Sequence, residues 1–142
     1  MHGIATALPP LYIACRNGRS NIARLLLEAG ADVDARSNDR MNTPLHRVSA
    51  YGGSDLLGLL IQFGADVDAK DRSENTPLHW ACERGNMETI RLLMDHGADP
   101  TIQNVRKKTP AEMMDNRVAE ANEIREILKM PREELGYCAP GM

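Results

Sequence analysis

The sequence predicts an all-α solenoid of stacked helix-turn-helix units. The tetrapeptide Thr-Pro-Leu-His occurs at residues 43–46 and at residues 76–79, and Thr109-Pro110 follows at the same interval. A Gly-Ala-Asp turn recurs in step with it, beginning at Gly30, Gly64 and Gly97. Between these signals, apolar residues are spaced as on one face of a helix. Such a unit cannot bury its apolar face alone, and stacking buries that face against the next unit.

A period of about 33 residues with a Thr-Pro-Leu-His core is the signature of the ankyrin repeat. The sequence resembles that family from about residue 8 to about residue 130. The resemblance implies an ankyrin-repeat solenoid in which β-turn fingers connect the helix pairs. We expect an ankyrin-repeat domain over residues 1–131, with a flexible C-terminal tail over residues 132–142. The expected repeats are 8–40, 41–73, 74–106 and 107–130.

The first repeat is incomplete at its start. We expect its helices over residues 11–17 and 20–29, because Gly18 and Gly30 stand where glycines end helices. The second helix carries apolar residues at positions i, i+3 and i+4, which predicts one buried face. The residues of that face are Ile22, Leu25 and Leu26.

The second repeat has helices expected over residues 45–51 and 54–63. Its apolar face is in register with that of the first repeat and consists of Leu56, Leu59 and Leu60. The finger before it, residues 36–42, is one residue longer than its counterpart at residues 70–75.

The third repeat, residues 76–97, is nearest to the family pattern, whereas the fourth departs from it after Thr109-Pro110. The last helix fits only after a two-residue insertion near residues 117–121. We interpret this repeat as a C-terminal cap that ends at Pro131, because a terminal repeat needs a polar outer face. Its expected buried residues are Ile124, Ile127 and Leu128.

Resemblance to the family also implies roles for repeated polar residues. A threonine caps each inner helix at Thr43, Thr76 and Thr109. His46 and His79 form hydrogen bonds with backbone groups of the adjacent unit. Pro9 and Tyr12 replace this threonine and histidine in the first repeat.

The fingers depart from the family pattern at one position. The family has a glycine where Met41, Glu74 and Lys107 stand in this sequence. A residue other than glycine at positive φ costs about 1 kcal/mol, so we expect strained or differently shaped fingers.

Composition limits the classes of function. A net charge of −3 argues against nucleic acid as the main partner. No apolar run is long enough to span a membrane, and no secretory signal is evident. Cys15 and Cys82 occupy equivalent positions two repeats apart, too distant for a disulfide, and are expected to be small buried apolar residues. We therefore expect an intracellular protein, cytoplasmic and/or nuclear.

No residue pattern predicts catalysis, a metal or a cofactor. His46 and His79 stand one repeat apart on equivalent ridges, whereas zinc needs three or four clustered ligands. The aspartates of the Gly-Ala-Asp turns recur with the repeat and are therefore interpreted as turn residues. We expect a protein that is not an enzyme and that has no cofactor.

Residues that the repeat leaves free are the candidates for function. In the ankyrin-repeat family these are the finger tips and the exposed positions of the inner helices, which form a concave surface. Here they are rich in arginine and include the only tryptophan, and Trp, Tyr and Arg are enriched at interface hot spots. The alternative is that Trp80 packs on a neighbouring helix and the arginines are merely solvated. The predicted partner-binding residues are Arg40, Arg47, Tyr51, Arg72, Trp80, Glu83, Arg84, Arg106 and Lys108.

The leading hypothesis is a protein–protein interaction module, an adaptor or inhibitor whose concave face binds a protein with an acidic surface. One alternative is an assembly or substrate-receptor subunit of a larger complex, with residues 131–142 as a docking peptide. Another is nucleic-acid binding through the arginines. The chain could also be a fragment of a longer ankyrin array, or it could self-associate through an uncovered N-terminal edge. That edge would consist of Leu11, Ala14, Ile22 and Leu26.

Overall fold

The computed structural model describes residues 8–37, 39–114 and 121–129. Three features predicted from the sequence lie outside these residues. They are the insertion near residues 117–121, apart from the backbone of Ala121, the end of the last helix at Pro131 and the flexible tail over residues 132–142.

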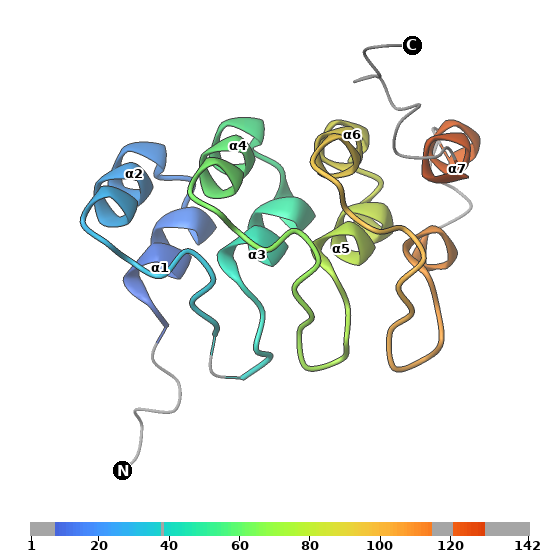
Figure 1. Cartoon of the computed structure of the whole chain (residues 1–142), viewed down its shortest axis with the longest axis horizontal. Helices are drawn as coiled ribbons and strands as arrows, with labels where there is room; N and C mark the ends of the chain where they lie inside the picture. The colour runs from blue at the N-terminus through green and yellow to red at the C-terminus, as the bar shows by residue number, and fades with distance from the viewer. Residues whose placement is uncertain (1–7, 38, 115–120, 130–142) are drawn as a thin grey trace.

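The described residues form a solenoid of helix pairs without strands, which confirms the predicted all-α class. Figure 1 shows α2, α4, α6 and α7 side by side in one row and α1, α3 and α5 in a second row, with fingers projecting beyond it. The elements are α1 (Pro10–Arg16), α2 (Ser20–Glu28), α3 (Pro44–Tyr51), α4 (Ser54–Gln62), α5 (Pro77–Arg84), α6 (Met87–Asp95), the 3₁₀ helix η2 (Pro110–Met113) and α7 (Ala121–Lys129).

The inner helices α1, α3 and α5 begin at prolines, which for α1 and α3 is one residue before the predicted start. Proline suits this place because the first helical N–H has no partner within the helix. In α3, the Thr43 side chain accepts a hydrogen bond from the backbone N–H of His46. The Nδ1 atom of His46 accepts in return from the backbone N–H of Thr43 at 3.0 Å. Thr76 and His79 form the same pair in α5, so the predicted caps are present in both helices.

The same histidines join neighbouring repeats. Because Nδ1 accepts a hydrogen bond, Nε2 carries the proton and donates. His46 Nε2 donates to the carbonyl of Asn75 at 2.8 Å, and His79 Nε2 donates to the carbonyl of Lys108 at 2.9 Å. Both rings are buried. Burial lowers the pKa of His46 to about 4 and also lowers the pKa of His79. These histidines are structural links between repeats.

Tyr12 makes the corresponding link in the first repeat. Its hydroxyl accepts a hydrogen bond from Asn42 Nδ2 at 2.9 Å, and Asn42 is the equivalent of Asn75 one repeat earlier. Burial raises the pKa of Tyr12. A phenol therefore replaces the family histidine while keeping a contact with the end of the next finger.

The fingers confirm the length difference expected from the sequence. In the first finger, Ser37 N–H donates to the carbonyl of Asn42, five residues later, at 2.9 Å. In the second, Asp71 N–H donates to the carbonyl of Asn75, only four residues later, at 3.0 Å. Successive fingers are joined by backbone hydrogen bonds, because Arg72 N–H donates to the carbonyl of Arg40 at 2.8 Å. The fingers therefore form one connected edge of the solenoid.

Each finger also contains a residue other than glycine at positive φ. The φ angles are 59° at Met41, 64° at Glu74 and 64° at Lys107, the three positions where the family has glycine. A Cβ atom is strained in this left-handed conformation. The fingers therefore keep the backbone conformation that suits glycine, with a strained Cβ atom at each of these three residues.

The outer helices confirm the apolar face of α4 and correct that of α2. Leu56, Leu59 and Leu60 are buried, but Ile22 and Leu25 are 46% and 65% exposed. Helix α4 packs between α2 and α6, whereas α2 has only α4 as an outer-helix neighbour among the described residues. The face of α2 is therefore in register with that of α4 but is only partly covered, because Leu26 is partly buried whereas Ile22 and Leu25 are exposed. The α2 residues that are buried are Ala23 and Leu27.

The N-terminal edge also differs from the predicted one. Leu11 and Ala14 are only 1% and 4% exposed, because the helices of one repeat pack on each other. Ile22 is exposed, as predicted, whereas Leu26 is partly buried; the other exposed apolar residues at this edge are Ile13 and Leu25.

The described part of the fourth repeat has one buried and one exposed side. Ile124, Ile127 and Leu128 are buried, as predicted. Glu123 lies on the exposed side and forms an ion pair with Arg91 of α6 at 3.0 Å. The remaining exposed charges of α7 are Glu126 and Lys129. The inner element is reduced to η2, where the Glu112 carboxylate accepts a hydrogen bond from Thr109 N–H.

Two cysteines lie in the core, as predicted. Cys15 and Cys82 are buried free thiols. Burial raises the pKa of Cys15 to about 11 and that of Cys82 to about 12, so both remain protonated at neutral pH. Among the described helices, none has the length and apolar character needed to cross a membrane.

The strained finger predicts that Glu74→Gly stabilises the protein. Glycine removes the Cβ strain at φ 64°, although it also increases the entropy of the unfolded chain. We expect a net gain of roughly 0.5–1 kcal/mol in the free energy of unfolding, measured by urea denaturation. Glu74→Ala is the matched control, because it removes the same carboxylate but keeps Cβ. Equal stabilities of the two variants would show that no strain is relieved.

The buried histidine predicts a loss of stability in weak acid. The pKa of His46 is about 4 in the folded protein, below the ordinary value of 6.5. The unfolded chain therefore binds a proton first as the pH falls below 6.5, and stability is lost between pH 6.5 and 4. This histidine should contribute about 2 kcal/mol to the loss between pH 7.5 and 5. In urea titrations, His46→Gln should be less stable at pH 7.5 but should lose less on acidification. An unchanged loss would contradict this assignment.

Candidate functional site

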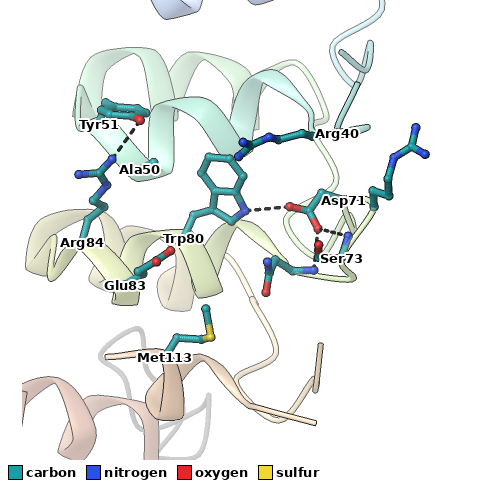
Figure 2. Close-up of a pocket in the computed structure, with 11 residues that line it drawn as sticks. Arg40, Ala50, Tyr51, Asp71, Ser73, Trp80, Glu83, Arg84 and Met113 are labelled. Atoms are coloured by element: carbon teal, nitrogen blue, oxygen red, sulfur yellow. Dashed lines mark hydrogen bonds between the residues drawn. The ribbon is translucent and has the colours of Figure 1, made fainter. Parts of the chain in front are cut away.

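The concave face contains a hollow of about 770 Å³ between α3, α5 and the finger at residues 71–75. We call it the central hollow; Figure 2 shows its lining side chains. Six predicted partner-binding residues line it: Arg40, Tyr51, Arg72, Trp80, Glu83 and Arg84. The lining residues absent from the predicted set are Ala50, Asp71, Ser73, Asn75 and Met113.

Trp80 forms a wall of the hollow, and the fold holds it in place. Its indole Nε1 donates to Asp71 Oδ2 at 3.0 Å, as Figure 2 shows. Its ring meets the buried ring of His46 edge to face, with ring centres 5.8 Å apart. The side chain is half-buried. Trp80 therefore packs on a neighbouring repeat, as the alternative interpretation expects, and it also lines the central hollow.

Asp71 organises the finger beside Trp80. Its Oδ1 accepts hydrogen bonds from the backbone N–H groups of Ser73 and Asn75, each at 2.9 Å, and its Oδ2 accepts the indole N–H. The residue is only 8% exposed. Three internal donors therefore occupy this carboxylate, which shapes the hollow without offering a free acidic group.

A comparison between repeats could have identified Asp71. Asn104 is its equivalent in the next repeat and holds the next finger in the same way, accepting from Arg106 N–H at 2.9 Å and Lys108 N–H at 3.1 Å. Asn104 Nδ2 also lies 3.4 Å from the sulfur of Met113, which occupies the place of Trp80. In both repeats, a polar residue that holds the finger stands nine positions before the residue at the Trp80 position, and this spacing could have identified Asp71.

Tyr51 gathers two arginines at one end of the hollow. The guanidinium carbon of Arg47 lies 4.1 Å from the centre of the Tyr51 ring, and that of Arg84 lies 4.7 Å from it. Arg84 Nη2 also donates to the Tyr51 hydroxyl at 3.0 Å, as Figure 2 shows. Cations near an aromatic ring are attracted to the negative face of its quadrupole. We call this group the Arg47–Tyr51–Arg84 stack.

Arg40 and Arg72 belong to the finger side of the hollow and are exposed. The backbone hydrogen bond between them keeps their fingers together. Glu83 precedes Arg84 on α5, is also exposed and lines the hollow, whereas Arg84 extends toward Tyr51, as Figure 2 shows. Because Asp71 is occupied internally, the accessible charge of the hollow comes mainly from arginine.

The structure does not bring every predicted residue to the central hollow. Arg47 contacts Tyr51 without lining it. Arg106 and Lys108 are exposed on the third finger, outside the lining, and the carbonyl of Lys108 accepts the bond from His79. Within the described ranges, no group of three or more His, Cys, Asp or Glu side chains could hold a metal.

A family model of ankyrin repeats, in three copies, matches residues 11–104 of the chain. The match covers the repeats that form the central hollow. No curated protein matches the sequence at a significant level.

Proposed function

The chain belongs to the ankyrin-repeat family of protein–protein interaction modules, and we propose that its concave face binds an acidic region of a protein partner. The observation that carries the proposal is the central hollow, whose lining includes Trp80 together with arginines from two fingers and an inner helix. The chain as a whole has a net charge of −3, so this basic face is a local feature. Such local charge steers an oppositely charged partner and sets its orientation.

The proposed role is that of an adaptor or inhibitor, which needs no chemistry of its own. A protein is favoured over nucleic acid because the basic side chains gather in one hollow with Trp80 and Glu83, while the net charge of the chain would repel phosphates. The free thiols of Cys15 and Cys82 are compatible with a reducing compartment, and we propose a cytoplasmic and/or nuclear location. The docking peptide of the larger-complex alternative, residues 131–142, lies outside the described residues.

Charge reversal on the concave face tests the proposal. Arg40→Glu combined with Arg72→Glu should abolish capture of the specific partner from the source cell, because both exposed guanidinium groups face an acidic surface in the proposed complex. Capture is measured by quantitative mass spectrometry against the wild type.

The matched control is Arg19→Glu combined with Arg24→Glu, which changes the net charge equally at exposed positions of the first repeat. This variant should capture the same partner as the wild type. Loss of capture only in the control would place the binding surface elsewhere. Trp80→Ala is a poor reporter, because it also removes the contacts with Asp71 and His46.

The exposed edge of the first repeat supports self-association as a second proposal. Ile22 and Leu25 are exposed, whereas the equivalent Leu56 and Leu59 are buried between outer helices. A second copy could supply that missing cover. In a symmetric pair of copies, the two apolar edges would meet each other.

Self-association predicts that Leu25→Glu converts a dimer into a monomer in sedimentation velocity. The charge would be buried at the centre of the symmetric contact, where it is strongly unfavourable. Leu92 stands at the equivalent place in α6 but is partly buried inside the array, so it offers no matched exposed control. Glu28→Gln, at the polar end of α2, should leave the dimer intact. A wild type that is monomeric at every concentration would refute this proposal.

A further inference from the structure

We propose that the Arg47–Tyr51–Arg84 stack is a carboxylate-binding clamp that holds an Asp or Glu side chain of a peptide bound in the central hollow. The inference rests on the proposed function, since it names the anchor of the partner on the same face. It adds the ligand group, which is a carboxylate, the two arginines that contact it, Arg47 and Arg84, and a positioning role for Tyr51.

The first support is the close approach of two cations. The distances of 4.1 Å and 4.7 Å to one ring centre place the guanidinium carbons of Arg47 and Arg84 no more than about 9 Å apart. The two come from different repeats, so the inter-repeat packing of α3 on α5 brings them together. Among the described residues, neither guanidinium forms an ion pair with a carboxylate. Two like charges held close together are stabilised by an anion that approaches both.

The second support is preorganisation. Arg84 is tied to the Tyr51 hydroxyl and lies over the ring, so part of its rotamer freedom is already lost before a ligand arrives. One of its five N–H donors is used by Tyr51, and the others can form the paired hydrogen bonds that match the two oxygens of a carboxylate. Arginine in this setting is more selective than lysine, which offers a point charge instead of a planar fork.

The third support is an unmet donor. Arg47 Nε is buried and has no hydrogen-bond partner among the described residues. A buried donor without an acceptor is unfavourable and calls for a physical explanation. An anionic oxygen that draws the Arg47 guanidinium toward the hollow would relieve it.

The acidic groups of the hollow leave the clamp available. The two oxygens of Asp71 accept three internal hydrogen bonds. Glu83 forms no ion pair with either arginine of the stack among the described residues, while Arg84, the next residue along α5, extends to Tyr51. A peptide carboxylate can therefore reach the clamp without competition from Asp71, and Glu83 disfavours a second acidic residue beside Trp80.

The test is a selection of random twelve-residue peptides displayed on phage against the full chain. Selected peptides should share an Asp or Glu. In a synthetic peptide of the selected sequence, replacing that residue by its amide should raise Kd about 10- to 100-fold. Arg84→Gln should weaken binding of the acidic peptide by only part of this factor, because Arg47 keeps its contact with the carboxylate. It should leave binding of the amide peptide nearly unchanged, because the group that Arg84 binds is then absent. Arg24→Gln, on the outer helix α2, is the matched control and should leave Kd unchanged.

Tyr51→Phe tests the positioning role separately. It keeps the ring and removes the hydroxyl that holds Arg84, so binding of the acidic peptide should weaken several-fold while binding of the amide peptide stays the same. A general loss of structure would weaken both peptides equally. Circular dichroism melting should show the variant to be as folded as the wild type.

The outcomes separate this inference from the proposed function. Peptides that depend on Arg40 and Arg72 but carry no carboxylate, or are indifferent to Arg84, would overturn the clamp and leave the concave interface standing. Peptides indifferent to all of these arginines would overturn both. An absence of any enriched peptide would also count against both.

Discussion

The architecture depends on a neutral histidine that is buried at the start of an inner helix and bonded on both sides. Its Nδ1 atom accepts from the threonine cap of its own helix, which leaves the Nε2 proton for the next finger. His46 therefore contacts three elements. It bonds to the backbone at the start of α3 and at the end of the finger at Asn75, and its ring packs against the ring of Trp80 on α5. The central hollow lies between α3, α5 and that finger, so the contacts of this ring help to hold together the elements that line it.

The sequence was sufficient to predict the helix pairs, because their signals are local. Thr43 and Thr76 mark helix starts, and the recurring glycines mark helix ends with positive φ. The exposure of α2 was not predictable from its own residues. Ile22 has the same spacing as Leu56, and only the helix packed against it decides whether an apolar side chain is covered.

The candidate site was predictable in composition but not in its internal contacts. The repeat showed which positions are free of scaffold roles, and six of the nine predicted residues line one hollow. The bond between Asp71 and Trp80 was not predicted, because it depends on how the finger folds back onto α5. This bond also changes the interpretation of Trp80. A residue type common at interfaces is here held by two internal contacts before any partner arrives.

The three residues at positive φ give the fingers different exposed side chains at equivalent positions. A glycine at each of these places would give every finger the same bare tip and a more relaxed backbone. Met41, Glu74 and Lys107 instead place an apolar, an acidic and a basic side chain at equivalent, exposed points of three successive turns. A similar backbone conformation at this position thus presents a different side-chain chemistry on each finger, and the same Cβ atom that causes the strain carries the side chain that distinguishes one finger from the next.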